Sequence, residues 1–157
     1  MILSVSKRTD IPAFFPEWFL QCLRDQKIGV KNPYNQKVVL REVTPKNTDC
    51  IVFWTKNALP MLPKLDQITA MGYVYYFQYT LNAYGVDIEP NLPSLNRKLA
   101  TFKALSDKIG KVKVIWRYDP ILFTPKYTPQ WHIQAFQKLC QELAGYTNKC
   151  VISFVDT

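Results

Sequence analysis

The stretch VIWRYDPI, residues 114–121, decides how this chain is expected to fold. Its first three residues are apolar and typical of a buried strand, whereas Arg117 and Asp119 are charged and a proline then ends the pattern. CIVFWTKN (50–57) repeats this order, and ILSVSKRTD (2–10) repeats it more loosely. Since several apolar strands end in polar residues, we expect these polar groups at the same end of one sheet.

Strand-like and helix-like segments alternate along the chain, which is typical of βαβ units around a parallel sheet. The residues after the first strand, SVSKRTD, lack the G-x-G-x-x-G loop of dinucleotide-binding folds. Polar residues after the strands instead favour the mouth of a barrel. We expect strands over residues 2–5, 28–32, 37–43, 50–54, 73–80, 112–118 and 150–155, and helices over 10–26, 57–72, 94–110 and 128–145.

The predicted fold class is therefore α/β, a partial (β/α) TIM-like barrel with about six mostly parallel strands and helices outside. A complete barrel needs eight strands and about 250 residues, whereas this chain has 157. We expect residues 1–157 to form a single α/β domain, the N-terminal portion of a longer barrel protein.

Composition narrows the class of protein. Apolar residues make up 48% of the chain and aromatic residues 14%, which indicates a globular protein. No run approaches the roughly 18 apolar residues of a membrane span, and no secretory signal opens the chain, so a cytoplasmic location is predicted. The four cysteines show no paired spacing and are expected to be reduced and mostly buried, with no metal site built from them.

The formal net charge of +8 fits an anionic partner such as nucleic acid or a phosphorylated substrate. The basic residues form no block, however. Most are single lysines on predicted helices, such as Lys98, Lys103 and Lys108, which we expect to lie on a solvated surface. The net charge alone therefore does not decide between a specific anion-binding face and an ordinary solvated surface.

In a barrel the residues at the strand ends converge on one opening, although they are far apart in sequence. Cations suit an anionic or phosphate-bearing substrate, and an aromatic side chain suits an apolar wall. We assign no metal ligand. The predicted catalytic residues are Asp10 and Asp119, and the predicted substrate-binding residues are Arg8, Lys31, Asn32, Trp54, Lys56, Asn57, Gln78, Thr80 and Arg117, with Ser6, Ser153 and Asp156 also at strand ends.

Each assignment has a structural alternative. Asp10 and Asn57 are also placed to cap helices, and Arg117 with Asp119 suits a rim ion pair. Gln78 lies inside an otherwise apolar strand, where a buried amide needs a partner. His132, the only histidine, lies on a predicted helix beside Trp131 and is expected to be an ordinary surface or helix-packing residue.

Six segments together resemble a known family: SKRTDIPAFFPEWF, VKNPYN, DCIVFWTKN, YYFQYTLNAYGVDIEPNLP, VIWRYDPI and CVISFVD. The sequence resembles the uncharacterised bacterial family domain of unknown function 1848. The resemblance covers essentially the whole chain and implies a TIM-barrel-like fold in longer proteins. It also implies a C-terminal cysteine cluster similar to the iron–sulfur site of radical-SAM enzymes, which this chain lacks.

Three hypotheses for function follow. The first is a barrel enzyme that binds an anionic or nucleotide-like substrate, with a [4Fe–4S] cluster and S-adenosylmethionine in the full-length protein only. The second is a metal-dependent phosphoesterase or nuclease-like hydrolase, and the third is a non-enzymatic nucleic-acid-binding domain. No membrane partner is expected. Six strands cannot close an eight-stranded barrel, so the unpaired edge predicts either association between copies of the chain or a distorted, open sheet.

Overall fold

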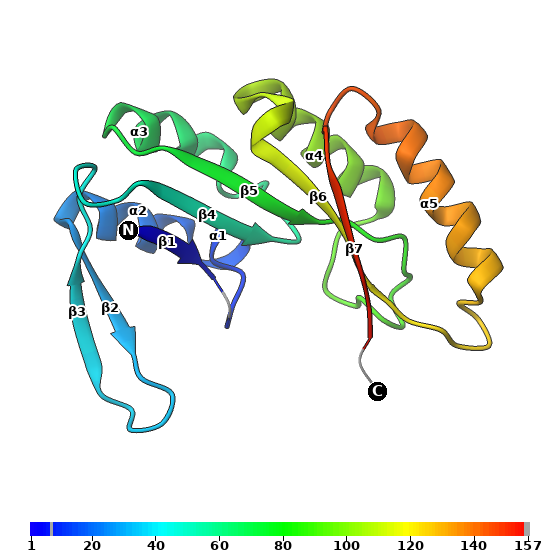
Figure 1. Ribbon diagram of the computed structural model, residues 1–157, viewed down its shortest axis with the longest axis horizontal. Helices are drawn as coiled ribbons and strands as arrows, with labels where there is room; N and C mark the ends of the chain where they lie inside the picture. Colours follow the sequence, from blue (N-terminus) through cyan, green and yellow to red (C-terminus); the bar gives the residue numbers. More distant parts are fainter. Residues whose placement is uncertain (7, 156–157) are drawn as a thin grey trace.

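The computed structural model describes residues 1–6 and 8–155, and five parallel strands form its centre (Figure 1). Every neighbouring pair in this sheet runs parallel, which confirms the α/β class with a mostly parallel sheet. The strands, in their order across the sheet, are β1 (Ile2–Val5), β4 (Cys50–Thr55), β5 (Tyr75–Thr80), β6 (Val114–Ile121) and β7 (Cys150–Phe154).

The remaining two strands form a separate hairpin, so the prediction of about six strands in the barrel sheet is not confirmed, and the main sheet has five. β2 (Lys27–Lys31) pairs antiparallel with β3 (Val38–Glu42) and with no strand of the main sheet. The turn between them is short, and Asn32 holds it by accepting from the backbone N–H of Tyr34 at 2.8 Å. A turn this short joins only antiparallel strands, because a parallel pair needs a crossover of a dozen or more residues.

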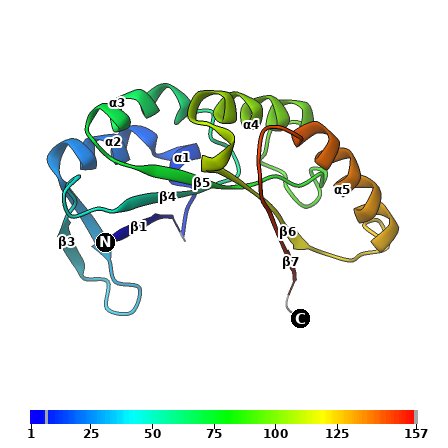
Figure 2. The same cartoon turned by 45° about the horizontal axis from the view of Figure 1, so that its top comes forward.

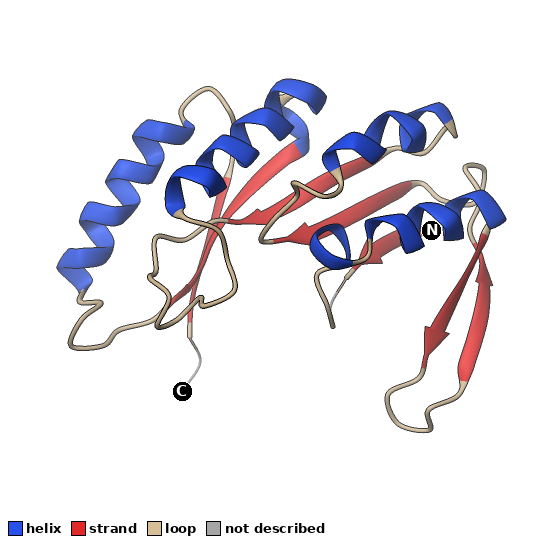
Figure 3. Ribbon diagram, turned by 180° about the vertical axis from the view of Figure 1, so that it is seen from behind, coloured by secondary structure: helices blue, strands red, loops and turns tan. Residues whose placement is uncertain are grey.

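All helices lie on one face of the main sheet (Figure 3). Two expected helices are shorter than predicted because prolines, which lack a backbone N–H, interrupt them. The helix expected over 10–26 is divided before Pro16, and the one expected over 57–72 opens as a 3₁₀ turn. The helices are α1 (Ile11–Phe14), α2 (Pro16–Asp25), α3 (Leu65–Ala70), α4 (Leu95–Ile109) and α5 (Pro129–Leu143), with 3₁₀ turns η1 (Leu62–Lys64) and η2 (Lys111–Lys113).

The sheet is curved, with the helices on its convex side and the opposite face open (Figure 2). β1 and β7 lie at its two edges, so the described residues do not close a barrel. The order of elements is that of consecutive βα units, with α3 after β4, α4 after β5 and α5 after β6. No helix among the described residues is long and apolar enough to cross a membrane.

The core lies between the sheet and the helices. Alternate residues of each strand point to this side. Phe53 and Phe77 are fully buried there, and their ring centroids lie 4.9 Å apart. Phe19 of α2 packs edge-on against Phe53 at 5.5 Å, and Tyr75 does so at 5.9 Å. This aromatic cluster joins the first helix pair to the middle of the sheet.

We expect Phe53→Ala to lower the free energy of unfolding by about 3–5 kcal/mol, because it opens a cavity among three aromatic rings. Phe53→Leu, which keeps most of the volume, should cost less. Urea denaturation followed by circular dichroism measures both. Phe14→Ala is the control, since Phe14 is 65% exposed, and its effect should stay within about 0.5 kcal/mol. Equal losses for Phe53→Ala and Phe14→Ala would contradict the placement of the core.

Candidate ligand-binding face

Polar side chains line up across the open face of the sheet. Trp54 of β4 lies in register with Gln78 of β5, and Arg117 of β6 lies in register with Thr80. These residues alternate with the buried core positions of the same strands, so their side chains point away from the helices. The strand VIWRYDPI thus has one apolar face in the core and one polar face toward the opening.

Arg117 is the centre of this polar row. Its guanidinium carbon lies 5.0 Å from the centre of the Trp54 ring, within the range of a cation–π contact. Its Nε and Nη2 donate to Oδ2 of Asp119 at 3.3 and 3.0 Å, and its Nη1 donates to Oε1 of Gln78 at 3.4 Å. Ser153 of β7 donates to the same Asp119 oxygen at 3.3 Å. Four of the five strands of the sheet therefore contribute a side chain to one cluster.

The cluster retains unused hydrogen-bonding capacity. A guanidinium has five N–H groups, and the bonds to described residues use three of those on Arg117. All hydrogen bonds from described residues to the Asp119 carboxylate go to Oδ2, which leaves Oδ1 without a described donor. Both side chains are partly buried, at 19% and 17% exposure, so the pair is less screened than a surface ion pair.

Trp54 is held in place from the edge strand. Its Nε1 donates to Oγ of Ser4 in β1 at 3.1 Å. Ser4 was not among the predicted site residues, although the alternation of ILSV places it on the same face as the polar residues of β4. The indole is therefore fixed by one hydrogen bond at its edge and by Arg117 over its face.

A small hollow of about 220 Å³ opens beside this row, at the carboxyl ends of β1, β4 and β5. It brings together four of the predicted residues, Asp10, Trp54, Lys56 and Thr80. Ligand pockets for drug-sized molecules span about 300–1,000 Å³, so this hollow suits a phosphate group or a single ring. Its lining consists of Ser6, Thr9, Asp10, Trp54, Thr55, Lys56 and Thr80.

Asp10 is engaged in structural hydrogen bonds. It is the N-cap of α1, where its Oδ1 accepts from the backbone N–H of Ala13 at 3.0 Å. The hydroxyl of Thr55 donates to Oδ1 and the backbone N–H of Lys56 donates to Oδ2, both at 2.7 Å. Asp10 therefore caps α1, as the structural alternative expected. It also links the loop after β1 to the end of β4.

Lys56 belongs to a second charged group. Its Nζ lies 2.9 Å from Oε2 of Glu89, whose other oxygen lies 3.5 Å from Nζ of Lys98. Lys98 also donates to the backbone oxygen of Asn82 at 2.8 Å and is 4% exposed. Burial lowers the pKa of the Lys98 ammonium below its ordinary value, and the neighbouring Glu89 opposes this shift. Glu89 thus partly neutralises the cation that Lys56 presents to the hollow.

The burial of Lys98 corrects the expectation of a solvated surface lysine. The position shares the apolar stripe of α4 with Leu95, Leu99 and Phe102, so a lysine there was a signal of a buried charge. Glu89 was missed as well, because it lies in the loop between β5 and α4, where residue periodicity carries no information.

Other predicted residues lie away from the cluster. Arg8 donates through Nη1 to the backbone oxygen of Lys31 at 2.8 Å, so it turns toward the hairpin and is not among the residues lining the hollow. Asn32 and Asn57 each accept from a backbone N–H two residues further on, which makes both of them turn residues. Asp156 lies outside the described residues. The structure thus brings Trp54, Gln78 and Arg117 together in one cluster, and Trp54 and Lys56 together in the hollow. Arg8 does not join either group.

The cysteines do not form a metal site. Cys22, Cys50, Cys140 and Cys150 are free thiols on four different elements, and three of them are partly buried while Cys140 is exposed. Burial raises the pKa of the Cys150 thiol to about 11 and raises the pKa of the other three above their ordinary value. Within the described residues, no three metal-binding side chains come together. This donor set does not fit an iron–sulfur cluster, which needs several thiolates around one point.

The fold and the open face place this chain in the class of parallel α/β proteins. In this class, ligands generally bind outside the carboxyl ends of the strands. The chain belongs to the family described as Domain of unknown function (DUF1848), which it matches over residues 2–157. No curated protein matches the chain, and neither does any solved structure.

We expect Asp10→Ala to destabilise the fold by about 3 kcal/mol, because three hydrogen bonds to one carboxylate are lost. Asp10→Asn should cost less, since it keeps one acceptor oxygen. Denaturant unfolding measures both variants against Asp66→Ala, whose carboxylate is 84% exposed and should contribute less than about 0.5 kcal/mol. An Asp10→Ala variant of unchanged stability would show that the three bonds are not structural.

Proposed function

We propose that this chain is the ligand-binding part of a barrel-type enzyme and that it takes an anionic, nucleotide-like ligand on the open face. The observation that carries the proposal is the Arg117 cluster. A charged side chain in the middle of a parallel sheet is costly unless it has a role or partners, and only three of its five N–H groups are paired with described residues. The other two are available to a ligand.

In this proposal, different residues of the open face bind different parts of the ligand. A planar ring fits against Trp54, which is held at its edge and stacked by a cation. The hollow of about 220 Å³, with Lys56 and Thr80 in its wall, is large enough for a phosphate group. Arg117 then donates to an oxygen or ring nitrogen between the two sites, so the planar part and the anionic part are recognised separately.

Asp119 is the better candidate of the two predicted catalytic carboxylates. Its Oδ2 is held by Arg117 and Ser153, whereas its Oδ1 accepts from no described residue. A carboxylate fixed through one oxygen can hold or accept a proton at the other. Asp10 lacks this freedom, because its two oxygens together receive three hydrogen bonds. The metal-dependent hydrolase hypothesis, which needs both carboxylates, therefore has less support from the structure.

The cofactors implied by the family resemblance take no part in this proposal. A [4Fe–4S] cluster and S-adenosylmethionine would require ligands other than the four dispersed thiols of this chain. The role proposed for the open face, namely binding and orientation of an anionic ligand, is independent of the radical chemistry that such a cluster would supply.

We expect Arg117→Gln to weaken ligand binding at least tenfold, because a hydrogen bond from a charged group is worth about 1.5–3 kcal/mol. Isothermal titration calorimetry with inorganic phosphate, ribose 5-phosphate and ADP measures this change. Arg97→Gln removes the same charge from the exposed side of α4 and should leave affinity unchanged. Equal losses in both variants would reduce the effect to net charge. Absence of binding by all three probes at millimolar concentration would contradict the proposal.

The β2–β3 hairpin supports nucleic-acid binding as a second candidate function. It projects from the sheet on the side away from α3 and α4 (Figure 1), and Tyr34 in its turn is 94% exposed. Exposed aromatic rings stack on bases, and cations pair with phosphates. The hairpin has one acidic residue, Glu42, and four exposed cations, which are Lys27, Lys31, Lys37 and Arg41.

We expect single-stranded RNA or DNA to bind with an affinity that falls steeply with salt, with a logarithmic slope of about −3 for four phosphate contacts. Tyr34→Ala should weaken binding roughly tenfold, because one stacked base is worth about 1–3 kcal/mol. Fluorescence anisotropy with a labelled oligonucleotide measures both effects, and Arg97→Gln again provides the control. Binding that depends on Arg117 and is indifferent to Tyr34 would assign the nucleic acid to the open face instead.

A further inference from the structure

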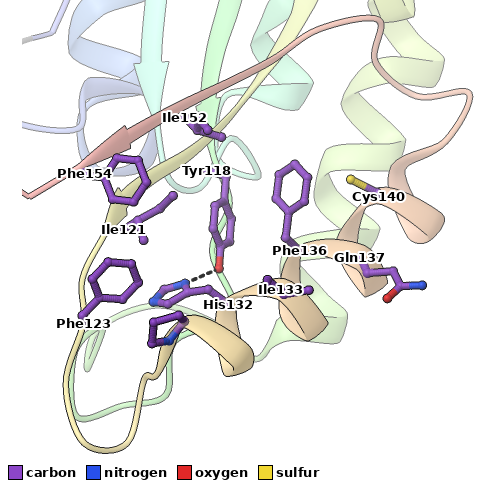
Figure 4. A pocket seen from close by; sticks show the side chains of 11 residues that line it. Tyr118, Ile121, Phe123, His132, Ile133, Phe136, Gln137, Cys140, Ile152 and Phe154 are labelled. Carbon is purple, nitrogen blue, oxygen red and sulfur yellow. Dashed lines mark hydrogen bonds between the residues drawn. The ribbon is translucent and has the colours of Figure 1, made fainter.

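Buried polar side chains also occur outside the Arg117 cluster. In the apolar groove between α5 and β7 (Figure 4), His132 Nε2 lies 2.8 Å from the backbone oxygen of Leu122. A carbonyl oxygen can only accept, so Nε2 carries the hydrogen, and Nδ1 accepts from the hydroxyl of Tyr118 at 2.7 Å. Both ring nitrogens are thus paired within the protein, and His132 has the helix-packing role that was one of its two expected roles.

Glu89 is a buried carboxylate in the irregular loop between β5 and α4. Its side chain is 5% exposed, and the Lys98 side chain beside it is 4% exposed. A buried charge is costly unless an opposite charge and hydrogen bonds compensate it. Lys98 Nζ lies 3.5 Å from Oε1 of Glu89 and donates to the backbone oxygen of Asn82 at 2.8 Å. The Glu89–Lys98 pair therefore neutralises the buried carboxylate and ties the loop to the start of α4.

The shorter contact of Glu89 is made with Lys56 instead. Lys56 Nζ donates to Oε2 at 2.9 Å, whereas Oε1 accepts no hydrogen bond from a described residue. Lys56 is 43% exposed and lines the hollow at the carboxyl ends of β1, β4 and β5. A carboxylate that already has a buried counter-ion does not need an exposed lysine, so the contact matters chiefly for Lys56.

The hydrogen bond to Glu89 restricts the flexible side chain of Lys56. An unrestrained lysine loses its rotamer freedom when it binds a ligand, and this loss weakens binding. An ammonium group has three N–H groups, and the bond to Glu89 uses one of them. A lysine restrained in this way keeps N–H groups for an anion and has little freedom left to lose.

We propose that Glu89 is a positioning residue of the anion site. The buried Glu89–Lys98 pair is a fixed base that holds Lys56 at the wall of the hollow before the ligand arrives. This inference rests on the proposed function, because it concerns the phosphate end of the same ligand. The opposite possibility is that Glu89 competes with the ligand for Lys56, and the two predict changes of opposite sign.

Isothermal titration calorimetry with inorganic phosphate tests the proposal on variants that keep the net charge of +8. Glu89→Met combined with Lys98→Met removes one charge of each sign, and such apolar replacement of a buried ion pair is often neutral for stability. We expect phosphate affinity to fall about fivefold, because the ligand must then order Lys56. Glu89→Asp keeps the carboxylate but shortens its reach toward Lys56, and should weaken binding about threefold. Circular dichroism verifies the fold of each variant.

Two controls separate positioning from effects on the fold. Lys103→Met with Glu142→Met removes another Lys–Glu pair, 2.8 Å apart between α4 and α5, and should leave phosphate affinity unchanged. In a Lys56→Met background, which should itself bind phosphate more weakly, Glu89→Met with Lys98→Met should have no further effect. Such non-additivity is expected only if the pair acts through Lys56.

Unchanged or tighter phosphate binding in either folded Glu89 variant would overturn the positioning role and leave the proposed function standing. Tighter binding would identify Glu89 as a competitor of the ligand. An equal loss of affinity with and without Lys56 would also overturn it, because the pair would then act through the fold. If the methionine pair does not fold, Glu89→Asp decides by the same criteria. A chain of native sequence that binds none of the probes, inorganic phosphate included, would overturn both proposals.

Discussion

Parallel pairing of five strands is the constraint on which the rest of this structure depends. Consecutive parallel strands need a crossover, and crossovers with a helix are almost always right-handed. The strand order β1-β4-β5-β6-β7 advances in one direction across the sheet, so each right-handed crossover places its helix on the same face. All helices therefore cover one face, and all strands end at one edge. The open face and the strand ends become the only places where polar groups of β4, β5 and β6 can meet. The core and the candidate site are two consequences of one topology.

Charge on the open face is tolerated because it is paired locally. Arg117 has Asp119 two residues away on the same strand and Gln78 on the next strand. At the strand ends, Glu89 forms ion pairs with Lys56 and Lys98. These two groups balance most of the charge near the hollow, so recognition of an anion there depends on the direction of the remaining N–H groups more than on net potential.

Local sequence patterns predicted most of the regular structure, because periodicity is a property of neighbouring residues. The helices α4 and α5 lie within one or two residues of the expected ranges, since each begins with a capping Ser or Thr and ends near a Gly. The strand VIWRYDPI was expected to end at residue 118, but β6 continues to Ile121. Its last residues pair with β7 across an irregular register, which only the neighbouring strand determines.

The amino-acid sequence alone determined the α/β class, the alternation of strand faces and the presence of Trp54, Gln78 and Arg117 on one of those faces. These properties follow from short-range periodicity and residue chemistry. Tertiary structure decided that β2 leaves the main sheet, that Lys98 is buried against Glu89, and that Arg8 turns to the hairpin. Each of these depends on which distant segments meet, and contact between distant segments is set by the packing of the whole chain.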